Sequence, residues 1–476
     1  MSEKDEQSKN GSTSEEGGEK SPPKPVGFFD PSLKHIRRKI FSKWLLTTVV
    51  LMGFIMGILS IYWGCLFRIE DNLGSLVFYV VDMDAQVAPY NTSGITPLVG
   101  PIITGLARSM VASGKPTLGW GPLFASDFNY DPIAVRQAVY DFKAWGAIII
   151  NPNATAMLYE AVQTGNTSYD PLGACQLVYQ DARDDTNWFD FINPIVRSFQ
   201  TEATSMVGKQ WSSMMLENAR SNTTLLANMA AVPQAISPAI GFSEYNLRPF
   251  YPYQSIPAVS IGLIYLIILS FFSFAFYLPI WFGFLKPEGH PPLRFIEFVV
   301  VRWGGTIAAY FFLSLAYSLV SLAFQINFSG GNPITSQTEP TLIEYGNPTA
   351  YGKGTFLVYW ALNWVGMAAL GLACENVAMV VGQPWTGLWL IFWVITNVST
   401  AFYDIDIEPG VFYYGYGFPL HYVVEGSRQI LFDLHSRIGL DFGVLFAWTA
   451  VNSAIFPIAC WFLMYKKKHD TREYWA

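Results

Sequence analysis

The sequence predicts an α-helical membrane protein that crosses the bilayer six times and carries an extracellular α/β domain between its first two spans. Only 14% of the 476 residues are charged, against roughly 25% in an ordinary soluble protein, and 51% are hydrophobic. The apolar residues also gather in long runs, most of them long enough to cross a hydrocarbon core of about 30 Å. The net charge of −7 excludes a nucleic-acid-binding role, because that role needs a basic surface.

The chain is expected to begin with a disordered cytoplasmic tail over residues 1–40. Residues 2–25 contain no large apolar side chain, so this stretch cannot bury enough surface to become ordered. No signal peptide is expected, because no apolar core lies near Met1. The first apolar run, residues 44–67, follows a cluster of Lys and Arg. Dense basic charge beside a span marks the cytoplasmic side, so the first span leads outward.

The segment between the first two spans, residues 68–255, is expected to fold as the extracellular α/β domain. Three short runs have the β-branched and aromatic content of strands: 76–81, 147–150 and 176–179. Helical periodicity covers three other stretches: 97–112, 131–144 and 188–217. Cys175 is the only cysteine of this segment, so the domain is expected to fold through its own core without an internal disulfide.

Five further spans are expected within residues 256–465. An even number of spans returns the C-terminus to the cytoplasm, where residues 466–476 form a short tail. Three lysines directly after the last window agree with this orientation, and the connection that contains Arg302 is then also inside. The five windows are 256–285, 303–324, 355–380, 385–402 and 442–465.

Five N-x-S/T triplets provide an independent indication of the orientation. All of them fall in segments that the six-span topology places outside, and they are candidate N-glycosylation sites. Two further matches, at Asn10 in the tail and Asn397 at the end of a span, are expected to be unused. The five candidates are Asn91, Asn153, Asn166, Asn222 and Asn327.

No motif predicts an enzyme, a cofactor or a metal site. A phosphate-binding loop needs G-x-x-x-x-G-K-[ST], and the nearest strings lack its first glycine and the following Ser or Thr. The chain alone is therefore not expected to bind ATP in that way. Its five histidines are scattered, and no second catalytic group accompanies any of them, so they are not expected to act as ligands or bases.

Glu375 lies inside an otherwise apolar span, where a carboxylate costs about 2.5 kcal/mol or more. One interpretation is that it marks a path for a substrate or a coupling ion. The other, which the sequence favours, is that Glu375 lies late in its span and reaches the cytoplasmic interface.

The segment between the last two spans, residues 403–441, contains an amphipathic helix over residues 420–436 that is too polar to span the membrane alone. Pro419 begins this helix, and Glu425 and Arg428 lie on its polar side. The segment is either a re-entrant hairpin covered by protein or an interfacial helix, and the spacing does not choose between them.

This last segment resembles the ABC-2-type export permeases, in which a proline-started, arginine-bearing outer helix precedes the final span. The string GFPLHYVVEGSRQIL over residues 417–431 carries this resemblance, together with LVFYVVDMD at 76–84 and WGAIIINPNAT at 145–155. More closely, nearly the whole chain after the tail resembles the fungal nitrosoguanidine-resistance membrane proteins. The strings matched there are GKQW at 208–211 and the stretch 414–431.

The resemblance implies a plasma-membrane, transporter-like protein that confers resistance to toxic small molecules, by export of compounds or lipids or by altering lipid asymmetry. Membrane lipids are the expected partners. Unlike a complete exporter, the chain has no fused nucleotide-binding domain, so a separate ATPase subunit would have to supply one, and a homo-oligomer is the other assembly considered. The candidate transport or gating residues are Glu375, Pro419, Glu425 and Arg428.

A non-transporting membrane regulator or scaffold that kept the permease fold is the alternative. The charged tail and the lack of an evident intramembrane charge pair favour this alternative.

Overall fold

The computed structural model describes residues 25–92, 94–285, 289, 291, 293–330, 338–340, 348–382 and 385–469. Within these residues five helical segments are long and apolar enough to cross a membrane, so the chain is a polytopic membrane protein. The chain divides into two compact units after Gly57. The five segments are Pro31–Cys65, Tyr253–Phe282, Phe295–Ala323, Gly352–Val381 and Ile438–Lys466.

The first unit contains the greater part of helix α1 (Lys34–Cys65). A short 3-10 turn, Pro31–Leu33, precedes it, and the side chain of Asp30 caps this turn by accepting a hydrogen bond from the Ser32 N–H at 2.9 Å. The predicted tail therefore ends too late, because its residues 34–40 are already helical. Lys and Arg are good helix formers and continue the apolar helix toward its start. Residues 1–24 of the predicted tail lie outside the described residues.

The α/β domain of residues 68–255 is built on a mixed five-stranded sheet with the order β2-β1-β3-β4-β5. Strand β1 pairs in parallel with β2 and β3, β3 pairs antiparallel with β4, and β4 pairs in parallel with β5. The three predicted strands are confirmed as the three central ones. The strands are β1 (Val77–Asp82), β2 (Gly119–Phe124), β3 (Gly146–Ile150), β4 (Cys175–Tyr179) and β5 (Phe242–Asn246).

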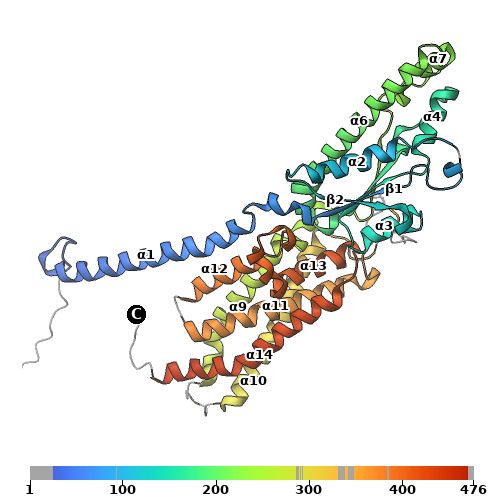
Figure 1. Cartoon of the computed structure of the whole chain (residues 1–476). Helices are drawn as coiled ribbons and strands as arrows, with labels where there is room; N and C mark the ends of the chain where they lie inside the picture. Colours follow the sequence, from blue (N-terminus) through green and yellow to red (C-terminus); the bar gives the residue numbers. More distant parts are fainter. Residues whose placement is uncertain are drawn as a thin grey trace, which may run out of the picture. The chain divides into compact units, whose positions relative to one another are not determined.

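Helices cover both faces of this sheet (Figure 1). One face packs in a large core with Phe199 and Trp211, which are fully buried on the long helix α6. The other face packs in a smaller core with Val135 and Val139 of α3. The helices of this domain include α2 (Val99–Ala112), α3 (Pro132–Tyr140), α4 (Ala154–Thr164), α6 (Asn193–Ala219) and α7 (Thr223–Ala231).

Helix α11 is the centre of the membrane bundle and packs against α9, α10, α12, α13 and α14 (Figure 1). Its glycines allow close approach: a Cβ on Gly371 would lie 2.5 Å from the hydroxyl of Tyr310, and one on Gly366 would lie 2.7 Å from Val423. The bundle helices are α9 (Ile264–Phe282), α10 (Phe295–Ala323), α11 (Thr355–Val381), α12 (Trp385–Val398), α13 (Pro419–Phe432) and α14 (Ile438–His469).

Two predicted spans are interrupted or clearly shorter in the structure. The window 256–285 begins as a separate short helix α8 (Ile256–Val259), because Ser260 leaves the helical region with φ −144° and ψ −114°. The window 385–402 is helical only over the 14 residues of α12. At 1.5 Å per residue, α12 is about 21 Å long, which is shorter than a hydrocarbon core of about 30 Å. Among the described residues the structure thus supports five candidate spans, and the sixth expected span is not confirmed.

Candidate functional site

Helix α13 is enclosed by protein along its whole length. Pro419 occupies its first turn, where a missing N–H costs nothing, and Asp433 ends it in a left-handed conformation with φ 52°. The helix therefore stops before the predicted residue 436. Every residue from Pro419 to Phe432 is buried except Glu425, which is half-buried. An interfacial helix would expose one side to lipid and the other to water, and α13 exposes neither.

The two sides of α13 have different neighbours. On its apolar side, Val423 packs over Gly366 of α11, and Gly426 lies against Leu362 of the same helix. On its polar side, Arg428 forms an ion pair across the domain boundary, with Nη1 3.1 Å from Asp184 Oδ2. This ion pair is almost completely buried, because each of the two side chains is only 6% exposed. Helix α13 thus joins the membrane bundle to the α/β domain.

A second ion pair holds the end of α13 against the α/β domain. Arg248 Nη2 lies 2.9 Å from Asp433 Oδ2, and its Nε donates to the Asp433 carbonyl at 3.1 Å. The hydroxyl of Tyr140 donates to the same carbonyl at 3.1 Å. The left-handed turn at Asp433 is therefore fixed by two side chains of the α/β domain.

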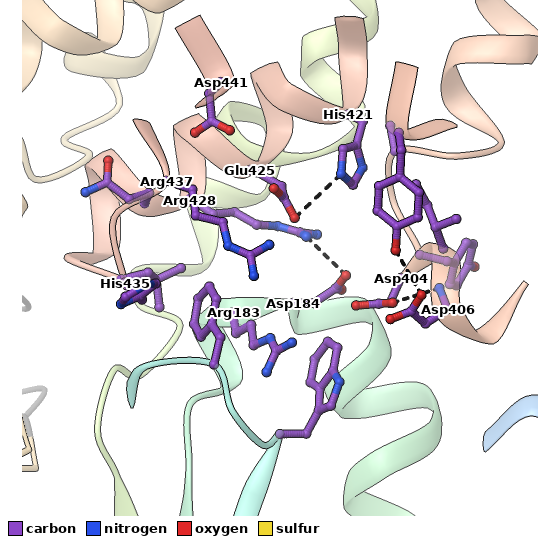
Figure 2. Close-up of a pocket in the computed structure, with 18 residues that line it drawn as sticks. Arg183, Asp184, Asp404, Asp406, His421, Glu425, Arg428, His435, Arg437 and Asp441 are labelled. Carbon is purple, nitrogen blue, oxygen red and sulfur yellow. Dashed lines mark hydrogen bonds and ion pairs between the residues drawn. The ribbon is translucent and has the colours of Figure 1, made fainter. Parts of the chain in front are cut away.

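Between α13 and the α/β domain lies a cavity of about 270 Å³, which we call the charged cavity (Figure 2). Its walls come from α13, the first turn of α14, residues 401–406 and the segment that follows β4. Ten of its 18 lining residues can carry charge: Arg183, Arg428, Arg437, His421, His435, Asp184, Asp404, Asp406, Glu425 and Asp441.

Burial shifts the pKa of several groups in the charged cavity. Burial raises the pKa of Asp184 to about 6, although the guanidinium of Arg428 acts in the opposite direction. It likewise raises the pKa of Asp404 above its usual value, against the effect of Arg183. The pKa of Arg183 is lowered by burial to about 10. Charged groups in this cavity are therefore poorly hydrated, which strengthens their electrostatic interactions with one another and with any polar ligand.

Several buried polar atoms at the charged cavity have no hydrogen-bond partner among the described residues. They include Nε and Nη2 of Arg428, Oε1 of Gln429 and both carboxylate oxygens of Asp441. Nη2 of Arg428 does lie 3.7 Å from Asp185 Oδ1, which is an ion pair but too long for a hydrogen bond. Leaving buried polar atoms unpaired is costly, so such a set indicates a place where water or a ligand binds.

Glu375 forms a second buried charged site, inside the membrane bundle. Its Oε1 lies 2.6 Å from Nη2 of Arg302 on α10, and both side chains are buried. Thr306 donates to its Oε2 at 3.3 Å. Glu375 is therefore paired with a cation inside the protein, and its position relative to the cytoplasmic interface stays a prediction. The expectation that Arg302 lies in the inside connection is wrong, because it belongs to α10.

The structure brings some of the predicted residues together and separates others. Glu425 and Arg428 both line the charged cavity, and Glu425 lies 3.6 Å from His421. Pro419 begins the same helix but does not line the cavity, and neither does Glu375. Glu375 instead pairs with Arg302 of α10, inside the membrane bundle. These residues therefore belong to two sites rather than one.

Sequence reasoning missed the residues that the α/β domain contributes to the charged cavity, above all Arg183 and Asp184. The only local signal was the highly charged string DARDD at 181–185. It begins two positions after the last residue of strand β4. No spacing rule relates position 184 to position 428, so their pairing becomes visible only in the fold.

The five predicted glycosylation sites all lie among the described residues, with different exposure. Asn91 and Asn222 are exposed, whereas Asn153, Asn166 and Asn327 are half-buried. Asn222 caps α7 with Oδ1, which accepts from the Leu225 N–H at 3.0 Å. Its Nδ2, the atom that carries a glycan, is not used by this cap. Asn222 is thus a well-presented candidate on the α/β domain.

The fold and composition define a class: a polytopic membrane protein with an α/β domain inserted before four of its membrane helices. Within that class, the chain belongs to the DUF3533 family, described as proteins of unknown function, whose profile matches residues 47–454. It is similar to an uncharacterized endoplasmic reticulum membrane protein of Saccharomyces cerevisiae, with 27% identity over 450 residues that cover 92% of this chain and 83% of that protein. No solved structure matches the chain.

Proposed function

We propose that this chain is a transporter-like membrane protein that moves lipids or amphipathic toxic compounds outward, and so confers resistance to them directly or through membrane lipid asymmetry. The observation that supports this proposal is the charged cavity between α13 and the α/β domain. This cavity is polar and lies beside α13, which packs in the membrane bundle. It can therefore bind a polar group at the boundary of the membrane. The role is one of binding and movement, not of catalysis.

The buried pair of Arg302 and Glu375 supports the same proposal. Charged side chains inside membrane segments are rare and often mark a pathway for a substrate or an ion. One argument for the alternative, a regulator or scaffold without transport, was the lack of such a pair, and that argument no longer applies. The firm attachment of α13 to the α/β domain through two ion pairs still supports the regulator or scaffold, because a firmly held helix suits a structural role.

The proposed topology has six spans, with α12 and the residues after it as the fifth crossing, the α/β domain extracellular and both termini cytoplasmic. We propose the plasma membrane as the location. The S. cerevisiae relative is named as an endoplasmic reticulum membrane protein, and the endoplasmic reticulum is therefore the second candidate. Fluorescence microscopy of a tagged full-length chain beside markers for the two membranes decides between them.

A reconstitution experiment tests the proposed function. The purified full-length protein in liposomes, with and without any ATPase that co-purifies with it, should move a fluorescent lipid or a nitrosoguanidine-type compound. Arg428→Gln should reduce both this movement and the resistance of cells at normal surface level, whereas Arg197→Gln, on the exposed surface of the α/β domain, should not. Resistance that persists without movement under any energisation contradicts transport and supports the regulator.

A further inference from the structure

The charged cavity contains basic and acidic side chains whose hydrogen-bonding atoms are not all satisfied among the described residues. Arg428 is 5% exposed and has two unpartnered nitrogens among the described residues, and Asp441 is fully buried with two unpartnered oxygens. Both line the cavity, from α13 and from the first turn of α14 (Figure 2). A simple anion would satisfy Arg428 but leave the two oxygens of Asp441 without a hydrogen-bond donor, and a simple cation would do the reverse.

The remaining charges extend this division. Arg183 and Arg437 add positive charge to the lining, and Glu425 and Asp404 add negative charge. Glu425 is also the one residue of α13 that is not fully buried, so its carboxylate is accessible from the cavity. The arrangement therefore complements a ligand that carries a negative and a positive group a short distance apart.

The size and place of the cavity indicate what kind of zwitterion fits. Its volume of about 270 Å³ is below the roughly 300–1,000 Å³ of sites for drug-sized molecules. Asp441 stands in the first turn of α14, a helix long and apolar enough to span the membrane. The first turn of a spanning helix lies near the level of the lipid headgroups. A phospholipid can place its small headgroup there and leave its acyl chains in the bilayer.

We infer that the charged cavity binds the zwitterionic headgroup of a phospholipid. The phosphate accepts hydrogen bonds from Nε and Nη2 of Arg428, neither of which has a hydrogen-bond partner among the described residues. The planar guanidinium of Arg suits phosphate especially well. The ammonium group donates to Asp441 and Glu425. The inference deepens the proposed function, on which it rests, by naming the substrate class.

A binding experiment with defined lipids tests this inference. The full-length protein in detergent is mixed with phosphatidylethanolamine, phosphatidylglycerol or soluble glycerophosphoethanolamine, and native mass spectrometry measures retention. Phosphatidylethanolamine should be retained about tenfold more than phosphatidylglycerol, because loss of charge-assisted hydrogen bonds has an effect of this order. Arg428→Gln and Asp441→Asn should each abolish this preference, whereas Arg197→Gln should keep it and Arg428→Lys should keep part of it.

Three results would overturn the inference: equal retention of the two lipids, a preference unchanged in both variants, or equal binding of soluble glycerophosphoethanolamine. Gel filtration identifies any variant that fails to fold, and then the remaining one decides. The liposome assay separates the two proposals. A headgroup preference without lipid movement contradicts the transport function alone, and lipid movement without any headgroup preference contradicts the inference alone.

Discussion

Arg302 and Glu375 stabilise each other's charge where neither could be tolerated alone. Their side chains meet at 2.6 Å, and Arg302, which is fully buried, also lies near the sulfur atoms of Met379 and Cys460. Removal of one partner leaves an unpaired buried charge, which costs about 3–5 kcal/mol, while replacement of both by apolar side chains of similar size is often tolerated.

Single and double variants of this pair therefore separate stability from function. Arg302→Met should lower the thermal midpoint in detergent strongly, and the double variant Arg302→Met/Glu375→Met should recover most of the loss. If the pair belongs to a transport pathway, the recovered double variant should still fail to restore resistance in cells. A double variant that is as unstable as the single one would contradict the pairing.

Glu408 is a buried carboxyl group of another kind, because both of its side-chain oxygens lack a hydrogen-bond partner among the described residues. Burial raises its pKa from 4.5 to about 9, and the neighbouring Asp404 adds to the effect. Between pH 4.5 and about pH 9, Glu408 therefore keeps its proton in the folded chain and loses it in the unfolded chain. The contribution of Glu408 to stability is therefore present below about pH 4.5 and is lost as the pH rises toward 9.

Glu408→Gln should remove this pH dependence. The variant should unfold at a higher temperature than the wild type at pH 8 and at about the same temperature at pH 5, with a difference on the order of 1–3 kcal/mol at pH 8. Glu70→Gln, which removes an exposed carboxylate, is the matched control and should show no such difference. The measurement is the thermal midpoint of both proteins across this pH range. If the midpoints of Glu408→Gln and wild type are equal throughout, Glu408 is ionised in the folded chain and the prediction is wrong.

At the scale of the elements, helix α11 depends on small side chains where other helices approach it. A Cβ on Gly371 would meet the hydroxyl of Tyr310 on α10 and, at 2.6 Å, the Cβ of Ser270 on α9. Gly371→Ala should therefore destabilise the bundle by about 1–3 kcal/mol through overpacking. Gly304→Ala on α10 is the matched control, because nothing lies within 4 Å of its added methyl group.

The comparison of these two variants by thermal unfolding in detergent has a clear expected sign. Gly371→Ala should lower the midpoint, and Gly304→Ala should leave it unchanged or raise it slightly, because Ala is a better helix former. Equal effects of the two substitutions would mean that α9 and α10 do not pack closely against α11.

The same scale shows which elements the sequence predicts and which it does not. Central strands such as β3, with the sequence GAIII, are buried on both faces and read as continuous apolar runs. The edge strands are less buried and have a different composition: β2 (GWGPLF) contains Gly and Pro, and β5 (FSEYN) contains polar residues. Neither strand was predicted from the sequence. Helix α12 was predicted too long because residues 399–402 are as compatible with a turn as with a span.

At the scale of the whole molecule, the candidate site depends on contacts that sequence spacing cannot supply. Arg428 was predicted from its own helix, but its partner Asp184 lies 244 positions away. The two become neighbours only because the α/β domain folds onto the helix that precedes the last span. Sequence reasoning could thus find the half of the charged cavity that lies on α13, and not the half on the domain.

The proposed orientation of the α/β domain has a direct test at this scale. If the domain is outside, Asn222 should carry a glycan, and treatment with an N-glycosidase should lower the apparent mass of the full-length chain expressed in yeast. Asn222→Gln should remove part of this shift, whereas Asn10→Gln in the tail should not change it. An apparent mass that does not respond to the enzyme would mean that none of the candidate sites is modified, and it would contradict the extracellular placement.

The buried pair in the bundle also has a consequence for biogenesis. Arg302 and Glu375 lie on α10 and α11, which follow one another in synthesis. Until α11 leaves the ribosome, α10 presents an uncompensated guanidinium to lipid, at a cost of about 2.5–3.5 kcal/mol. The two helices are therefore expected to leave the translocon together as a hairpin. Glu375 of α11 then compensates the charge of Arg302 and stabilises the insertion of α10.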